Sequence, residues 1–147
     1  MVTMSKTLEG FGYARLVGIK DDTLGGIRQA LIRGLPFRAV EQFRALTNLP
    51  NEDIMGVMRM KPATYARRKA AGRLNQEESE RLLKATRIFS MAMQLYGGNK
   101  DAARVYFKYP SSKLDGETPM QLIITDDESA RQVEDLLFAQ LRGDVIG

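Results

Sequence analysis

The chain has 147 residues, of which 44% are hydrophobic and 27% are charged, and its formal net charge is +4. This composition supports one compact domain or two very small ones and argues against a chain that is disordered throughout. Because the sequence contains no Cys and no His, disulfides, thiolate metal sites and the commonest general base are excluded. No apolar run approaches the roughly 20 residues of a membrane span, and no apolar signal-peptide core is present. We therefore expect a cytoplasmic protein that is no enzyme, binds no metal or cofactor and has no membrane partner.

The charges are unevenly distributed along the chain. Residues 1–73 contain 13 Lys and Arg against 6 Asp and Glu, a balance of +7, whereas residues 74–147 contain 9 against 12, a balance of −3. A basic half that faces phosphates is one interpretation, because clustered Lys and Arg attract polyanions. Chance clustering in a protein without such a partner is the other.

Helical periodicity begins after an irregular start. Residues 1–22 show little periodicity, so we expect an arm or an irregular cap there. Apolar residues then recur at intervals of three and four, which predicts helices over residues 24–35 and 37–46, separated by Pro36. The apolar face of the first helix comprises Leu24, Ile27, Leu31 and Leu35.

The stretch KPATYARRKAAGRL at residues 61–74 carries five positive charges and no negative one. Short helices are predicted over residues 51–58 and 62–71, the second opened by Pro62, whose missing N–H costs nothing at a first helical position. Two short helices joined by a tight turn form a helix-turn-helix, the second helix of which enters the major groove of DNA. With Tyr65 packing inward, the DNA-contact candidates are Lys61, Thr64, Arg67, Arg68 and Lys69. An ordinary solvated basic helix is the alternative.

Two positions in this segment depart from the usual helix-turn-helix pattern. Many such motifs have a small residue within the first helix and glycine in the turn, where Met55 and Arg59 stand here. A positive φ at Arg59 would carry strain that glycine avoids. The turn is therefore open to reshaping, and whether DNA binding is retained is an open question at this point.

Start and stop signals divide the second half into further helices. Asn75 with Glu78, and Thr125 with Glu128, have the spacing of a capping box. A long helix is expected from the first of these boxes to the glycines at 97–98, which end it. Its apolar stripe is broad, which is typical of a central helix that is buried on most sides.

The segment LDGETPMQL predicts a turn followed by another helix start. Asp115 and Gly116 form the turn, Thr118 is the cap, and Pro119 takes the first helical position. We interpret Gly116, Thr118 and Pro119 as structural residues. A short helix capped by Asn99 precedes this segment.

The last predicted helix ends at Gly143 and is apolar around much of its circumference. The apolar arc that includes Ala130 and ends at Phe138 spans about 200° at 100° per residue. A surface helix needs only a narrower stripe, so the excess indicates a second packing partner. We interpret Val133, Leu136 and Leu137 as core residues and Phe138 as an interface residue.

No segment alternates with period two, so the fold class is predicted to be all-α. The expected division is an N-terminal arm over residues 1–22, a helix-turn-helix domain over 23–73 and a second small helical domain over 74–147.

The second half resembles the toxin-binding domain of the Xre/MbcA/ParS antitoxins over about residues 66–145. The segments that carry the resemblance are GRLNQEESERLLKATRIFSMAMQLYGG, DAARVYF and LDGETPMQLIITDDESARQVEDLLFAQLRGDVIG. Their order matches that family: an opening rich in Glu, a long helix ending in glycine, a short helix, a Gly-x-Thr-Pro turn and a final helix. The preceding region resembles the Xre-like helix-turn-helix of these antitoxins more weakly.

This resemblance implies a function in a type II toxin-antitoxin system. Such antitoxins bind and block a partner toxin, most often a RES-domain enzyme that consumes NAD, and they repress their own operon by binding operator DNA. The family is all-α and dimerises, so a homodimer is expected here. Its final helix and the tail after it face the toxin, which makes the toxin-contact candidates Glu134, Phe138, Leu141, Arg142, Asp144 and Ile146. Residues of the helix opening that match the family are Arg73, Glu77, Glu78, Ser79 and Arg81.

Two other classes of function stay open. One is a stand-alone transcriptional regulator whose second half serves only for dimerisation. The other is an enzyme, for which the acidic runs at residues 77–78 and 126–128 are the candidates. Both runs lie at helix starts, where carboxylates interact favourably with the helix dipole, and no nucleophile, His or phosphate loop accompanies them.

Overall fold

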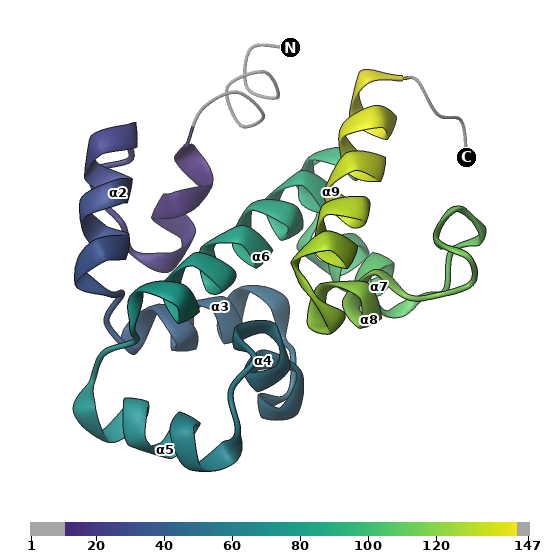
Figure 1. Cartoon of the computed structure of the whole chain (residues 1–147). Helices are drawn as coiled ribbons and strands as arrows, with labels where there is room; N and C mark the ends of the chain where they lie inside the picture. The colour runs from purple at the N-terminus through teal and green to yellow at the C-terminus, as the bar shows by residue number, and fades with distance from the viewer. Residues whose placement is uncertain (1–10, 144–147) are drawn as a thin grey trace. The chain divides into compact units, whose positions relative to one another are not determined.

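The computed structural model describes residues 11–143, which form helices and no strand (Figure 1). The all-α prediction is therefore confirmed. The α-helices are α2 (Leu24–Arg33), α3 (Arg38–Thr47), α4 (Asn51–Met58), α5 (Pro62–Ala71), α6 (Gln76–Leu95), α7 (Lys100–Lys108), α8 (Pro119–Thr125) and α9 (Asp127–Arg142), and the 3-10 helices are η1 (Gly12–Val17) and η2 (Ser112–Leu114). No helix within residues 11–143 is long and apolar enough to cross a membrane.

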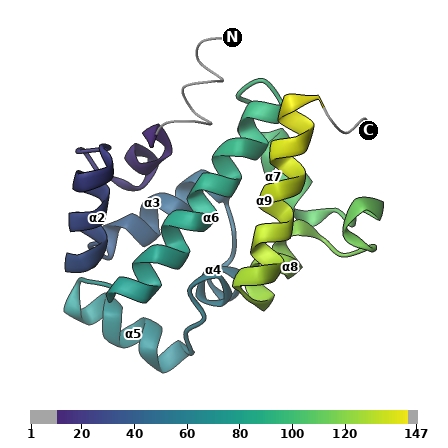
Figure 2. The same ribbon diagram turned by 45° about the horizontal axis from the view of Figure 1, so that its top comes forward.

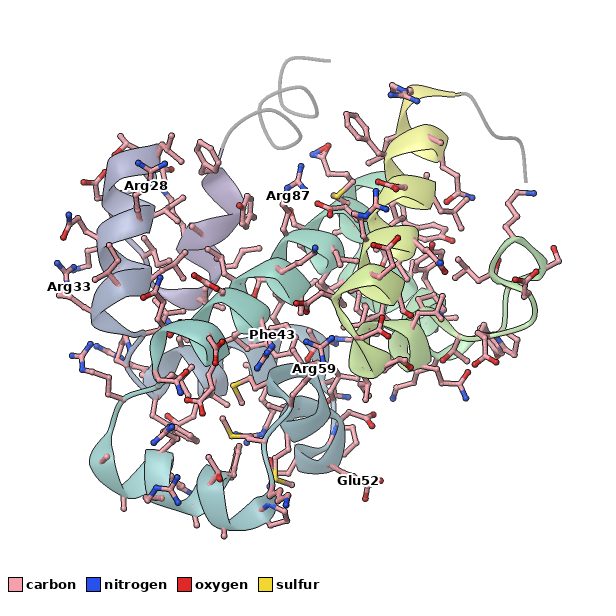
Figure 3. The ribbon with its side chains drawn as sticks, in the orientation of Figure 1. Arg28, Arg33, Phe43, Glu52, Arg59 and Arg87 are labelled. Carbon is pink, nitrogen blue, oxygen red and sulfur yellow. The ribbon has the colours of Figure 1, made fainter. Side chains whose placement is uncertain are left out.

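The chain forms two compact units, Met1–Arg87 and Ile88–Gly147, which divide inside α6. In unit 1, η1 packs against α3. Ala14 of η1 is completely buried, and so is Phe43 of α3 (Figure 3). The described part of the expected arm, residues 11–22, thus contributes to the core of unit 1.

Helix α2 lies on the surface of unit 1 and buries less than its sequence pattern predicts. Thr23 caps it by accepting a hydrogen bond from the Gly26 N–H at 3.1 Å, and Ile27 is buried as expected. The expectation that Leu24 belongs to a buried face is wrong, because its side chain is 53% exposed. The glycines at 25 and 26 supply no side chains that would cover it.

The segment after α2 is joined to the segment before α6 by backbone hydrogen bonds. The Phe37 N–H donates to the Gly72 carbonyl and the Leu74 N–H to the Leu35 carbonyl, both at 2.9 Å. Gly34 has a φ of +84°, and a Cβ at this position would lie 2.0 Å from the Leu74 carbonyl oxygen. This close backbone contact holds the connection between α5 and α6 against the segment after α2.

Unit 2 is built on the C-terminal part of α6, together with α7, α8 and α9 (Figure 2). Phe89 of α6 meets Phe107 of α7 edge to face, with ring centroids 5.2 Å apart. Helices α8 and α9 pack together, and α9 buries Val133 and Leu137 completely. These two residues are core residues, as the sequence predicts.

Most predicted helix caps are confirmed. Asn75 and Glu78 exchange both capping hydrogen bonds, at 2.8 and 2.9 Å. The side chain of Asn99 caps α7. Thr118 and Gln121 form the capping box that opens α8. The motif Gly-x-Thr-Pro is thus, first of all, a helix start.

One predicted cap is wrong. The cap of α9 is Asp126, whose Oδ1 accepts from the Ser129 N–H at 2.8 Å, and not Thr125 paired with Glu128. Thr125 is the last residue of α8, where its hydroxyl donates to the Gln121 carbonyl at 2.6 Å. Because the preceding helix uses Thr125, the neighbouring carboxylate takes the cap position.

Candidate functional site

A turn of three residues joins α4 to α5. Arg59 adopts the left-handed conformation with a φ of +56°, as the sequence comparison with helix-turn-helix motifs predicts for this position. The Arg59 N–H donates to Gly56 and the Met60 N–H to Met55, which is the Schellman pattern that ends many helices. The turn therefore keeps a regular helix-terminating geometry even though it lacks glycine.

Helix α5 packs against the rest of unit 1 through a few side chains, and none of its residues is completely buried. Its Tyr65 ring meets the Phe37 ring edge to face at 5.3 Å, so Tyr65 packs inward as expected. The guanidinium of Arg44 donates to the Tyr65 hydroxyl and also to Asn51 Oδ1 at 2.5 Å. This network joins α5 to both α3 and α4.

A second tether joins α5 to the start of α6. Arg68 Nε donates to Glu78 Oε1 at 2.7 Å, and the two side chains are only 24% and 8% exposed. The hydrogen bond to the Glu78 carboxylate raises the pKa of the Arg68 guanidinium. Arg68 is a DNA-contact candidate from the sequence, but in the structure its charge is turned toward the capping box of α6.

The remaining DNA-contact candidates lie outward or at the edge. Lys61, Arg67 and Lys69 are exposed, and Thr64 is half-buried. At 100° per residue, the side of α5 opposite Tyr65 and Arg68 is centred on three exposed alanines. These are Ala63, Ala66 and Ala70. Arg67 lies at one margin of this alanine face and Lys69 at the other.

This arrangement suits a helix that approaches a nucleic acid closely. Alanine methyl groups keep the helix backbone near whatever it faces, and they can contact thymine methyl groups. Arginine reaches guanine edges or phosphates, whereas lysine acts on phosphates as a point charge. The face itself therefore has no side chain for base-specific hydrogen bonds, and the two cations at its margins are of the kind that suits phosphates.

Residues of the acidic helix opening hold unit 1 together. Ser79 is completely buried. Its hydroxyl donates to the Asn75 carbonyl at 2.7 Å and accepts from the Leu35 N–H at 2.8 Å. Together with the ion pair of Glu78, these bonds give the Glu and Ser of the helix opening a structural role.

The partner-binding candidates on α9 form one side of that helix. Phe138 is 38% exposed, and the guanidinium carbon of Arg142 lies 4.9 Å from its ring centroid. Glu134 and Leu141 are half-buried beside it. The candidates Asp144 and Ile146 lie outside the described residues.

Sequence reasoning missed a second surface in unit 2. A pocket of about 780 Å³ opens between α7, the η2 segment and α9, and Tyr96, Tyr106 and Tyr109 contribute to its lining. Burial raises the pKa of the Tyr106 hydroxyl to about 12, and nearby Tyr96 adds to this effect. No single motif signals the pocket, because its lining comes from residues scattered between positions 96 and 140.

Metal chemistry finds no support in the described part of the chain. Within residues 11–143, no group of three or more Asp and Glu side chains is arranged to hold a metal ion. The acidic runs at residues 77–78 and 126–128 lie in the first turns of α6 and α9 or cap them. Their observed roles are structural.

Two family models and two curated relatives match the sequence of this chain. Residues 27–87 match the antitoxin Xre-like helix-turn-helix domain, and residues 91–143 match the antitoxin Xre/MbcA/ParS C-terminal toxin-binding domain. A protein named antitoxin Xre from Photorhabdus laumondii is 26% identical over 113 residues, 76% of each chain. Another antitoxin Xre, from Yersinia enterocolitica, is 27% identical over 105 residues, 71% of this chain and 70% of the relative.

The first match includes residues 74–87, which the sequence-based division placed with the second domain. This agrees with the hydrogen bonds that join the start of α6 to α5 and to the segment after α2. The two matches follow each other in the order that the two units take along the chain. The chain belongs to the Xre/MbcA/ParS family of antitoxins, with a helix-turn-helix domain followed by a toxin-binding domain.

Proposed function

We propose that this antitoxin neutralises a RES-domain, NAD-consuming toxin encoded beside it, and that it represses its own operon by binding operator DNA as a homodimer in the cytoplasm. The observation that carries the proposal is the presence of both matched domains in one chain, each with an exposed surface suited to a partner. Neutralisation belongs to residues 91–143 and DNA binding to α5.

The toxin-binding part of the proposal rests on the exposed side of α9. A partly exposed Phe138 stacked with Arg142 has the composition of an interface centre, where aromatic and arginine side chains are enriched. Leu141 and Glu134 extend this surface along the helix. In our proposal it covers the entrance to the toxin's active site, and the tail with Asp144 and Ile146 continues the contact.

The DNA-binding part rests on the exposed face of α5. Lys61, Arg67, Lys69 and the edge residue Thr64 contact DNA in our proposal, while Arg68 holds the helix in position. One short helix provides too few contacts for tight binding. A dimer places two copies on half-sites about one helical turn of DNA apart, or a multiple of that distance.

Co-expression with the neighbouring gene product tests the proposal. Cells that produce the toxin alone should stop growing and lose NAD, and the full-length antitoxin should restore both growth and NAD. Phe138→Ala should weaken this protection, whereas Leu24→Ala, an equally conservative truncation in unit 1, should not.

Continued NAD loss with abundant folded antitoxin would contradict neutralisation of an NAD-consuming toxin. If the same protein still bound the upstream DNA, the stand-alone regulator would be the better assignment.

A further inference from the structure

The pocket on unit 2 has the features of a binding site. All of its lining residues lie between positions 96 and 140, and therefore inside the match to the toxin-binding domain. Three of the chain's five tyrosines, Tyr96, Tyr106 and Tyr109, contribute to the lining. The rings of Tyr96 and Tyr106 are inclined by 56° with centroids 6.1 Å apart, so they present both edges and faces.

The apolar side chains around this pocket are unusually exposed. Tyr109, Val105 and Tyr96 are 65%, 51% and 43% exposed. They make up half of the six large apolar side chains that are exposed within residues 11–143. Single exposed apolar residues are ordinary, but several that gather around one hollow mark a surface that a partner covers.

The chemistry of the lining favours a cation. Tyrosine rings carry negative charge density on their faces, which attracts guanidinium and ammonium groups. Asp101 contributes a carboxylate that is 88% exposed, but it is ion-paired with Arg104 at 3.0 Å, so the preference for a cation rests on the tyrosine rings. Lys113 opposes this preference, but it is exposed, and its long side chain can direct the ammonium into water. Arginine combines a planar charge with the ability to stack on aromatic rings, so it fits this lining better than lysine does.

The charge of the whole domain points the same way. Residues 91–143 contain six Lys and Arg and eight Asp and Glu, so this part of an otherwise basic chain is slightly acidic. An acidic surface favours a basic partner segment over a second copy of its own acidic domain. The tyrosine rings and the net charge of this domain thus both favour a cationic side chain from another protein.

Helix α9 contributes to the pocket through a different side from the one that carries Phe138. Leu136 lines the pocket, and at 100° per residue it lies about 200° around the helix from Phe138. The buried residues Val133 and Leu137 occupy the sector between Leu136 and Glu134. The pocket therefore lies apart from the Phe138 surface on α9.

We propose that the pocket lined by Tyr96, Val105, Tyr106 and Tyr109 receives an arginine side chain of the toxin. This inference rests on the proposed function, because it names a second contact in the same antitoxin–toxin complex. The arginine stacks on the exposed ring of Tyr109, in the pocket to whose lining Asp101 also contributes.

The experiment measures the affinity of full-length antitoxin variants for the purified product of the neighbouring gene by isothermal titration calorimetry. Tyr109→Leu keeps an apolar side chain but removes the aromatic face, and it should weaken binding by about 2- to 30-fold, the range of a cation–π contact. Tyr109→Phe keeps that face and should bind within about 2-fold of wild type.

A pair of charge variants tests the sign of the occupant. Val105→Lys should bind at least about tenfold more weakly than Val105→Glu, because like charges repel across a desolvated interface. Leu24→Lys and Leu24→Glu form the matched control, since Leu24 is 53% exposed and lies in the other unit. These two controls should bind the toxin equally well.

Each remaining outcome has a definite meaning. Wild-type binding that none of the pocket variants alters would overturn the pocket inference and leave the proposed function standing. Equal losses for Val105→Lys and Val105→Glu would overturn the cationic occupant. If light scattering shows that Tyr109→Leu changes the oligomeric state of the toxin-free protein, the pocket seats a second copy instead. A wild type that does not bind the toxin would overturn both the proposed function and this inference.

Discussion

Gly34 and Gly72 show how single residues position α5 against the rest of unit 1. Both have a positive φ, +84° and +82°. A Cβ at Gly34 would lie 2.0 Å from the Leu74 carbonyl oxygen, whereas a Cβ at Gly72 would meet nothing within 4 Å. Gly34 also has a ψ of 138°, and residues with a side chain avoid this ψ when φ is positive. Gly72 has a ψ of 10°, which is ordinary for the left-handed conformation.

We therefore predict that Gly34→Ala destabilises the protein more than Gly72→Ala. Gly72→Ala should lower the free energy of unfolding by about 1–2 kcal/mol, the cost of the left-handed conformation for a residue with a Cβ. Gly34→Ala should cost at least about 2 kcal/mol more, because the Leu74 carbonyl must also move. Urea unfolding followed by circular dichroism measures both values. Equal losses for the two variants would contradict the close approach of the two backbone segments.

At the scale of elements, α5 is attached to the rest of unit 1 mainly through the side chains of Tyr65 and Arg68. The sequence treats Arg67 and Arg68 as equivalent, but the structure gives them different partners. Arg68 contacts Glu78, whose side chain is only 8% exposed, while Arg67 is exposed at the margin of the alanine face. Removing Arg68 would leave a buried carboxylate without its cation.

Two single variants should separate these roles. Arg68→Ala should lower the free energy of unfolding by about 1–3 kcal/mol, because Glu78 loses a charged hydrogen bond in a buried position. Arg67→Ala should change it by no more than about 0.5 kcal/mol and should weaken binding to the upstream DNA of the operon. Urea unfolding and fluorescence anisotropy with labelled DNA provide the two measurements. A stability loss for Arg67→Ala that equals the loss for Arg68→Ala would contradict the assignment.

The helices were predictable from the sequence because their boundaries are set locally. Pro62 marks the start of α5 because proline is favoured at a first helical position. The side chains of Asn75 and Thr118 each accept a hydrogen bond from the backbone N–H three residues later, and they thereby specify the starts of α6 and α8. The start of α9 was mispredicted because Thr125 and Asp126 are both good caps, and the end of α8 decides between them. The Arg68–Glu78 pair and the tyrosine pocket were not predictable, since both arise from tertiary contacts between separate elements.

At the scale of the whole molecule, the excess of basic residues and the exposed aromatic side chains lie in different parts of the chain. Basic residues dominate residues 1–73, with a balance of +7, and their exposed members include Lys61, Arg67 and Lys69 on α5 or just before it. Exposed aromatic residues gather in unit 2, at Tyr96, Tyr109 and Phe138. Two partners of different chemistry can therefore be served by two sets of residues that do not overlap.

Binding to DNA and binding to the toxin should accordingly be separable by mutation. Arg67→Ala combined with Lys69→Ala should weaken DNA binding and flatten its salt dependence by about 0.9 in log–log slope for each phosphate that is no longer neutralised. The same variant should bind the toxin like wild type, because neither residue belongs to residues 91–143. Val105→Lys should show the opposite pattern, with weaker toxin binding and an unchanged salt slope on DNA. Anisotropy titrations at several salt concentrations and calorimetry with the toxin measure both properties for each variant. One outcome would contradict this separation: a variant that loses both DNA binding and toxin binding while its unfolding curve matches that of the wild type. The two surfaces would then not be independent, and one shared surface would have to serve both partners.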